Sequence, residues 1–448
     1  MNDKVLEDSV VGTVDQLNLF EPPVIQSAVI RSHIVDIRPT SHLSSGDQAP
    51  IHFSLGADSR FYLDIHQSRL HVKARLLHAD GSKLAEAKEG DAESSDEDVA
   101  PTNLTLQSLW SAVQVKVAGK STGQSTTGAY PYVALFQNLL RNSSAAKRGP
   151  MAAQMYFKET GKNLDTDTRL NMGYNKRKAY FKGSRQVSME GPLLADFCSI
   201  QKYLLCNTSV EISLFRSRPE FLVQTTTDKQ YSMKIEDIFF KAHYVEVAAG
   251  VIAGHSESLK KNALAIYPFC KTDFKVFNIA QGSTNFSFDN LFNNSYPQRV
   301  LCALVRSDAY SGNSKMNSFF LQNFSLNHIE LCADGVSVPG RGPNMDFDDM
   351  GRGVASAYLS LYDAVGASNS PIFYNDIDMD DFCHSHCIFA FPLQASALGG
   401  NFMEIKRTAN LSIKGTFSEA LKQSVSLLVY SEFPGIAEID ASRNLTIH

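Results

Sequence analysis

The 448-residue sequence lacks the features of a membrane, secreted or disulfide-rich protein. No apolar run approaches the roughly 18 residues that a bilayer-spanning helix needs. Residues 1–20 are acidic and contain no apolar core of the signal-peptide kind, so we expect no secretion by that route. The seven cysteines are odd in number and have no framework spacing, which predicts reduced thiols and synthesis inside a cell. A net charge of -5 gives no whole-protein attraction to nucleic acid or anionic membrane.

Catalytic signatures are missing as well. The sequence contains no phosphate-binding loop, no GxSxG nucleophile elbow, no HExxH zinc motif and no dinucleotide fingerprint. The glycines around Arg341 and Arg352 have no strand-to-helix frame, and nothing places the plentiful serine, histidine and aspartate residues as a triad. We therefore predict that the protein is not an enzyme, that it has no catalytic or cofactor-binding residues, and that it needs no cofactor.

The sequence is rich instead in the two-residue alternation of β-strands. In residues 68–77 the apolar Leu70 and Val72 share one face, while His71 lies on the other. The same alternation predicts further strands at residues 27–37, 51–55, 113–117, 231–247 and 424–433. Apolar residues at helical spacing predict two short helices, at residues 132–140 and 355–364.

Two segments do not show this alternation. Residues 85–100 are acidic and serine-rich and lack large apolar residues before their end, which predicts a solvated loop. Residues 144–186 are polar and basic and end in NKRKAYFKGSR, from Asn175 to Arg185. That basic run could meet phosphate backbones, but we favour a subunit-interface loop or an ordinary basic face.

The first half of the sequence resembles the second. A strand at 69–76 and a strand at 299–306 are each followed by a strand, a short helix and a closing strand in the same order. The offset between matching segments falls from about 230 to about 215 and then to about 200, as unequal loops would produce. Two β-rich halves can share alternation by chance, but here strand order, flanking turns and helix position agree. We interpret the pattern as a duplicated fold.

Each half provides roughly eight strands in about 200 residues, which is typical of a two-sheet sandwich. A parallel α/β fold is disfavoured because regular helices between the strands are missing. We predict an all-β protein of two tandem eight-stranded jelly-roll sandwiches, a double jelly roll, with short helices in loops. The predicted parts are an N-terminal arm (1–24), a first domain (25–247, with long loops at 80–102 and 141–190), a second domain (248–440) and a C-terminal tail (441–448).

Several segments carry a family resemblance. They are LNLFEPPVIQSAVI from Leu17, the FYLD and VKAR strand segments of residues 61–75, YLLCNTSVEISLFRS from Tyr203, and VSLLVYSEFPGIAEIDASRNLTI from Val425. In this order they resemble the double jelly-roll major capsid proteins of Polinton/Maverick-type elements and of adintovirus-like viruses. The resemblance covers nearly the whole chain, apart from the acidic loop and the stretch from Cys383 to Cys387.

This resemblance implies a structural major capsid protein of the hexon-like kind. It would form a homotrimer whose six jelly rolls make a pseudohexagonal capsomer, and capsomers would tile an icosahedral shell around double-stranded DNA that is not bound sequence-specifically. Implied partners are further copies of the chain, penton proteins and minor capsid proteins. The implied location is the virion, after synthesis in the host cell and assembly in its nucleus. The arm and the tail are expected to become ordered only on assembly.

One candidate metal site is Cys383-His384-Ser385-His386-Cys387, which offers four possible zinc ligands in five residues. If residues 382–391 form a strand, the cysteines and the histidines face opposite ways and cannot easily surround one ion. We therefore expect buried or strand-edge thiols rather than a metal site.

A second candidate is the carboxylate run Asp376, Asp378, Asp380 and Asp381, with Asp346, Asp348 and Asp349 upstream. Alternating oxygen ligands can bind calcium, but the glycine and closing glutamate of an EF-hand loop are missing. A solvated acidic loop is the favoured interpretation, and no metal ligand is predicted.

Two other functions are compatible with tandem sandwiches. A two-domain jelly-roll carbohydrate-binding protein or glycan-directed hydrolase is the alternative, but the secretion signal that would favour it is absent. A minor or penton-like capsid component is disfavoured because such proteins usually carry a single sandwich.

Overall fold

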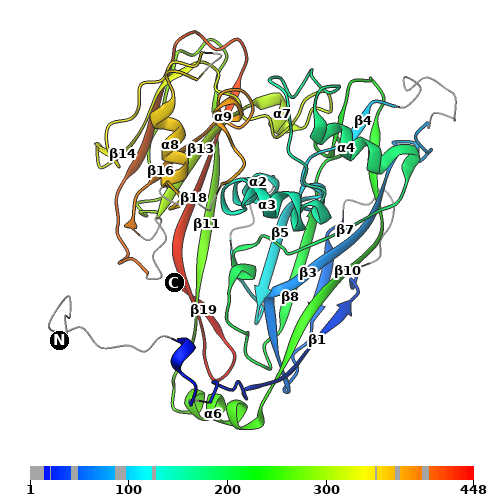
Figure 1. The fold of residues 1–448 in the computed structure, drawn as a ribbon, viewed down its shortest axis with the longest axis vertical. Coiled ribbons are helices and arrows are strands. Elements are labelled where there is room, and N and C mark those ends of the chain that lie inside the picture. Colours follow the sequence, from blue (N-terminus) through cyan, green and yellow to red (C-terminus); the bar gives the residue numbers. More distant parts are fainter. Residues whose placement is uncertain are drawn as a thin grey trace.

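The computed structural model describes residues 15–20, 22–41, 49–85, 97–123, 128–348, 351–368, 374–395 and 403–448. Figure 1 shows two β-sandwiches side by side, with helices between them and toward one end. Strands from the first half of the chain build one sandwich, and strands from the second half build the other.

The first sandwich consists of two antiparallel sheets. The first sheet contains, in spatial order, β1 (Val29–Ile37), β10 (Tyr231–Val247), β3 (Phe61–His78) and β7 (Val187–Gly191). The second sheet contains β2 (Ile51–Leu55), β8 (Val210–Arg216), β5 (Trp110–Val117) and β6 (Lys120–Ser121). A separate pair is formed by β4 (Val99–Pro101) and β9 (Val223–Thr225).

The second sandwich repeats this plan. One sheet contains β11 (Ala265–Ile279), β18 (Val425–Ile439), β13 (Arg299–Arg306) and β16 (Ile388–Pro392), and β19 (Leu445–Ile447) pairs with β18. The other sheet contains β12 (Asn285–Phe288), β17 (Leu411–Phe417), β14 (Leu326–Ala333) and β15 (Val336–Val338).

The two sandwiches have the same topology. When β4, β9 and β19 are set aside and the remaining strands of each half are counted in chain order, both halves give sheets ordered 1-8-3-6 and 2-7-4-5. This order, with every named strand pair antiparallel, is a jelly roll. The predicted fold class, two tandem jelly-roll sandwiches, is confirmed.

Alternation of side chains explains the cores. In β2, Ile51, Phe53 and Leu55 are buried while the residues between them are exposed, so one face points into the sandwich. The core of the first sandwich is drawn from its two sheets. The core of the second sandwich also includes residues of the first half, among them Ala129, Tyr132 and Phe136.

Helices connect and cover the strands. They are α1 (Thr105–Ser108), α2 (Tyr130–Arg141), α3 (Ser144–Arg148), α4 (Met172–Phe181), α5 (Pro219–Leu222), α6 (Ala249–Lys260), α7 (Ser307–Ser311), α8 (Ala355–Asp363) and α9 (Met379–His384), with the 3-10 turns η1 (Asp15–Leu17), η3 (Pro150–Gln154), η4 (Lys182–Ser184) and η5 (Asp196–Ser199). Helices α2 and α8 confirm the two predicted helices. Helix α6 links the sandwiches and was not predicted. In the described part of the chain, no helix has both the length and the apolarity to cross a membrane.

The two predicted long loops contain more structure than expected. The segment 141–190 holds α3 and α4 and ends in β7, which pairs with β3. The loop 80–102 ends in the buried strand β4. Residues 86–96 of the predicted acidic loop lie outside the described residues.

Two further predictions are wrong. Residues 382–391 are not one strand, because α9 continues to His384 and β16 begins at Ile388. Asp378 and Asp381 form a capping box at the start of α9, which favours a helix over an extended chain. The C-terminal tail is ordered within the single chain, because Leu445 is buried where β19 pairs with β18.

Candidate functional site

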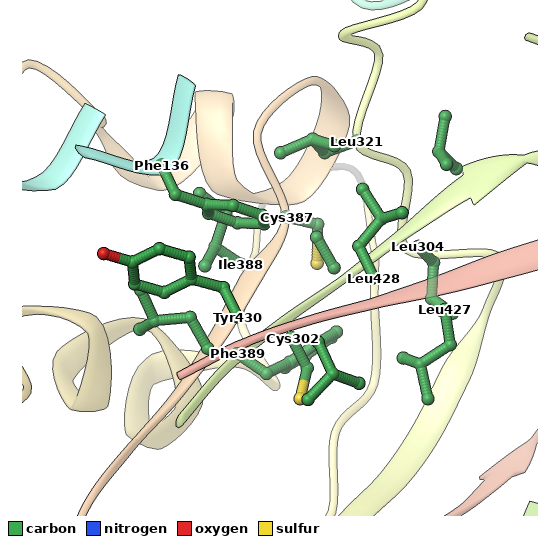
Figure 2. Packing of buried hydrophobic residues seen from close by; sticks show 14 of the residues in the cluster. Phe136, Cys302, Leu304, Leu321, Cys387, Ile388, Phe389, Leu427, Leu428 and Tyr430 are labelled. Atoms are coloured by element: carbon green, nitrogen blue, oxygen red, sulfur yellow. The ribbon is translucent and has the colours of Figure 1, made fainter. Parts of the chain in front are cut away.

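The two sandwiches are joined by helix α2, which belongs to the first half but packs on the second (Figure 2). Pro131 occupies its first turn, where its missing N–H group costs nothing. The ring of Tyr132 stacks on Phe274 of β11 at 6.1 Å between centroids, and that of Phe136 lies 5.6 Å from Tyr430 of β18. The junction is therefore built as a hydrophobic core.

A buried carboxylate, Glu432 of β18, adds charge to this junction. Arg141 at the end of α2 approaches it at 2.6 Å, Arg299 of β13 approaches it at 3.0 Å, and the hydroxyl of Tyr430 donates to it at 2.7 Å. Burial alone would raise the pKa of Glu432, but the two guanidinium groups outweigh it and hold the pKa at about 2. The carboxylate therefore stays ionised and ties α2 to two strands of the second sandwich.

A second carboxylate at the junction comes from the first half and binds a residue of the second half. Asp196 of η5, in the first half, accepts hydrogen bonds from the backbone N–H and the hydroxyl of Thr272 on β11, at 3.0 and 2.6 Å. Burial raises its pKa to about 6, and the hydrogen bonds from Thr272 only partly oppose that shift.

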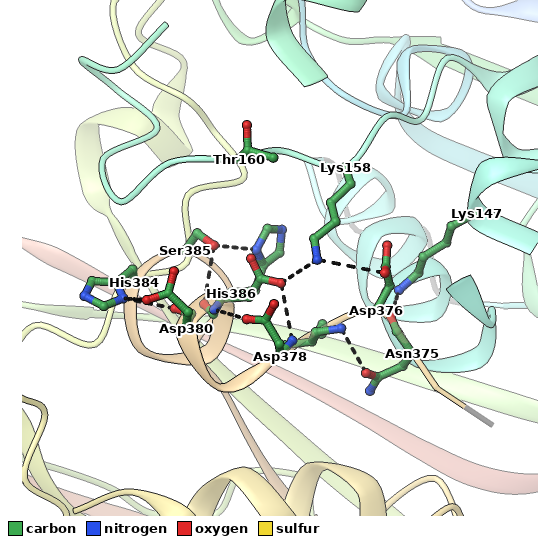
Figure 3. Close-up of polar contacts among 12 residues, drawn as sticks. Lys147, Lys158, Thr160, Asn375, Asp376, Asp378, Asp380, His384, Ser385 and His386 are labelled. Carbon is green, nitrogen blue, oxygen red and sulfur yellow. Dashed lines mark hydrogen bonds and ion pairs between the residues drawn. The ribbon is translucent and has the colours of Figure 1, made fainter. Parts of the chain in front are cut away.

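The predicted acidic run meets the predicted basic loop at a polar junction (Figure 3). Lys158, which follows η3, lies 2.8 Å from a carboxylate oxygen of Asp381 and 3.9 Å from one of Asp376. Lys147 of α3 donates to the carbonyl oxygens of Leu139 and Asn375. Burial lowers the pKa of Lys147 to about 7.

The polar junction corrects the interpretation of the acidic run as a solvated loop. The side chain of Asp380 is 69% exposed, as expected, but that of Asp376 is 7% exposed. Asp378 caps α9, and Asp381 is both part of the capping box and a partner of Lys158. Upstream, Asp348 pairs with Arg352, while Asp349 lies outside the described residues. Asp376 and Asp381 therefore join the halves of one chain, whereas Asp378, Asp380 and Asp348 make local contacts within the second half.

The candidate zinc ligands are scattered rather than gathered. Cys387 lies in the apolar cluster of Figure 2, whereas His384 contacts Asp380 at 3.2 Å on the outside. His386 is buried against the hydroxyl of Ser385, and burial lowers its pKa to about 4. Burial also raises the pKa of Cys383 to about 11, so its sulfur stays a thiol. Among the residues that the structure describes, no three His, Cys, Asp or Glu side chains are arranged to hold a metal ion.

The basic run from Asn175 to Arg185 is largely helical and is used within the chain. Arg177 of α4 is fully buried and pairs with Glu159 at 2.7 Å. Lys178 pairs with Asp98 at 3.0 Å, and Tyr180 stacks on Phe157. A role for its remaining cations in contacts between subunits stays a prediction.

The residues that join the two halves had little local signal in the sequence. Glu432 could have been noticed as a single carboxylate in the apolar run VSLLVYSEF. Arg141 and Lys158 had no such signal, because their partners, Glu432 and Asp381, lie in the other half of the chain.

No family model matches the chain. A curated relative, the uncharacterized protein F54H12.2 of Caenorhabditis elegans, is 25% identical over 403 residues, which is 89% of this chain and 93% of that protein. Three solved structures from viruses share the fold at low identity. A chain of the Sputnik virophage is 11% identical with a TM-score of 0.62, covering 100% of this chain and 94% of its own.

The other two neighbours are also viral. A chain of the PBCV-1 virus capsid is 8% identical with a TM-score of 0.58, covering 96% of this chain and 98% of its own. The Faustovirus major capsid protein is 9% identical with a TM-score of 0.56, covering 93% of this chain and 92% of its own. The likeness to these three viral chains, one of which is a major capsid protein, supports the double jelly-roll fold that the strand order of the present chain shows.

Proposed function

We propose that this protein is a structural major capsid protein that assembles as a homotrimeric capsomer. The observation that carries the proposal is the repeated jelly roll, in the same strand order twice, matched over almost the whole chain by viral capsid proteins. The expectation that it is not an enzyme accompanies this proposal.

The junction supports a role as a rigid building block. Two similar sandwiches in a fixed orientation give one chain two similar outward walls, and three such chains around a threefold axis present six. Domains linked by a thin polar contact would move against each other. Here α2 buries aromatic side chains in the second sandwich, and Glu432 and Asp196 add polar links across the same boundary.

Several finer proposals rest on the sequence resemblance. They are affiliation with Polinton/Maverick-type elements and adintovirus-like viruses, tiling of an icosahedral shell around double-stranded DNA, contacts with penton and minor capsid proteins, and assembly in the nucleus. We also propose the division into an arm (1–24), two domains (25–247 and 248–440) and a terminal segment (441–448). The pairing of β19 makes that last segment part of the second sandwich.

The mass of the purified protein in solution tests the proposal. A capsomer has three times the chain mass of 49.4 kDa, and light scattering after size exclusion measures that mass directly. Electron microscopy of the same species should show a three-fold particle with a pseudohexagonal outline. A stable 49.4 kDa monomer that binds glycans would overturn the capsid proposal and favour the carbohydrate-binding alternative.

A further inference from the structure

The segment that precedes β1 has an unusual surface. Five apolar side chains between residues 17 and 25 are 66–101% exposed, namely Leu17, Leu19, Phe20, Val24 and Ile25. Figure 1 shows this segment at the end of the molecule where α6 lies. We call residues 15–25 the apolar arm, excluding Glu21, which lies outside the described residues. An exposed cluster of this kind is costly in water and is a common mark of a contact surface.

The same end of the molecule carries a groove of about 670 Å³. Its wall is mostly apolar and is formed by one end of β1, β3 and β10, helix α6, the start of β11 and the segment 201–205. Its apolar and aromatic side chains include Tyr62, Val251, Leu259, Leu264, Ile266 and Tyr267, and polar side chains such as Asp64 and His255 also line it. Two of them, Leu264 and Ile266, are 47% and 48% exposed, so the groove leaves apolar surface open to water.

The arm does not cover the groove of its own chain. The carbonyl of Ala28, at the rim, accepts a hydrogen bond from the N–H of Ala248, and the side chain of Gln26 bonds both the N–H and the carbonyl of Val29. These bonds fix the direction in which the chain leaves β1. Pro22 and Pro23 then favour a stiff, extended course rather than a reversal.

We propose that the apolar arm of one copy docks in this groove of a second copy. The arm provides large apolar side chains without a cover, and the groove provides apolar walls without a filling. Its volume is in the range of pockets that take a few large side chains. The inference rests on the proposed function, since it needs copies in contact, and it names the two surfaces through which they meet.

Cross-linking between two marked chains tests this contact. One chain carries Phe20→Cys and a second, differently tagged chain carries Leu264→Cys, and the two are co-expressed and co-purified. A short thiol-specific linker should then join them into a species of about twice 49.4 kDa that bears both tags. The seven native cysteines interfere little, because six are buried. Both replaced side chains are exposed, so folding should be unchanged.

A second pair of cysteine substitutions controls for cross-links that form by random collision. Val336 in β15 is also exposed, and Phe20→Cys with Val336→Cys should give at least tenfold less product. Equal yields from both pairs overturn the proposal. A link formed inside a single chain that carries both Phe20→Cys and Leu264→Cys also overturns it, because the arm would then fill its own groove.

A peptide measures the same contact without a cross-link. In the full chain carrying Leu19→Asp and Phe20→Asp, the arm should no longer bind the groove of another copy, which leaves the groove free. A labelled peptide of residues 15–27 should then bind this variant. The same peptide with both aspartates should bind at least tenfold more weakly, and equal binding contradicts the proposal. If the peptide does not bind and the unsubstituted protein has the mass of a trimer, the arm contact alone is rejected. If the unsubstituted protein is a 49.4 kDa monomer, the proposed function is rejected as well.

Discussion

The two sandwiches contain equivalent sheets whose outer faces differ sharply. In the second sandwich, Phe274, Tyr430 and Leu301 lie opposite one another on β11, β18 and β13, and α2 covers them. In the first sandwich, the equivalent strands place Lys241 opposite Arg69 and Phe239 opposite His71. We call the face of the second sandwich that α2 covers the covered face, and the equivalent face of the first sandwich the open face.

The difference shows how duplicated sheets diverge with their surroundings. Six consecutive residues of β13, from Val300 to Val305, are buried, as in a strand covered on both sides. In the matching part of β3, buried Leu70, Val72 and Ala74 alternate with partly exposed polar side chains. On the open face the charges pair with one another, for example Lys241 with Glu190 at 2.6 Å. One face is therefore built for permanent burial and the other for water or a polar contact.

Removing an aromatic side chain from the covered junction should have the largest effect. Phe136 is fully buried between α2 and the β11-β18-β13-β16 sheet, so Phe136→Ala should lower the free energy of unfolding by about 4 kcal/mol. Urea unfolding followed by circular dichroism measures the loss. The matched change on the open face is Phe239→Ala; this side chain is 9% exposed, but its outer contacts are the side chains of His71 and Arg38 and not a helix. It should cost about 1–2 kcal/mol, and equal losses would mean that the two faces are not different in kind.

The charge pairs should differ in the same direction. Glu432→Gln leaves Arg141 and Arg299 without their buried anion, which should cost about 3 kcal/mol in the same unfolding experiment. Glu190→Gln on the open face removes a partner of His71 and Lys241 that water can replace, and should cost less than about 1 kcal/mol. A loss at Glu190 as large as that at Glu432 would refute the distinction.

The pH dependence of the junction gives a smaller effect. The pKa of Asp196 is raised to about 6 in the folded chain, above its ordinary value of 3.8. Its contribution to stability is therefore complete below about pH 4 and is lost as the pH rises through 6. Asp196→Asn, which can still bond Thr272, should remove a fall of about 2–3 kcal/mol over this range. Unfolding midpoints at pH 4 and 7 measure it, and an unchanged difference between them would contradict the assignment.

The fold was predictable because alternation is a local signal. The strand at 231–247 and both predicted helices could be read from neighbouring residues, and the repeated order of strands indicated the duplication. The helix α9 was missed because FCHSHCIFAF contains β-forming residues, while the capping box that starts it lies upstream, at Asp378 and Asp381. Local apolar content favoured a strand, and the cap favoured a helix.

The site was less predictable because its partners are distant in sequence. The acidic run and the basic loop were each identified, yet nothing local indicated that Lys158 would meet Asp381. No local pattern in the sequence indicated that one face would be covered and the other left open. Both sheets alternate in sequence, and whether α2 lies on one of them depends on how the halves are oriented.

The smallest effect on stability should come from two exposed ion pairs in and next to β1. Arg31 pairs with Glu246 and Arg38 with Asp237 across the open face, and both arginine side chains are largely exposed. Replacing both by alanine should lower the free energy of unfolding by only about 0.5–1 kcal/mol, because such pairs are weak in water and Arg38 also gives up its contact with the Phe239 ring. The same double variant then separates two meanings of an open face. A mass that remains three times that of the chain shows a wall that faces solvent in the capsomer, whereas dissociation to 49.4 kDa shows that another copy covers it. The second outcome would make the open face the intermolecular counterpart of the face that α2 covers within the chain.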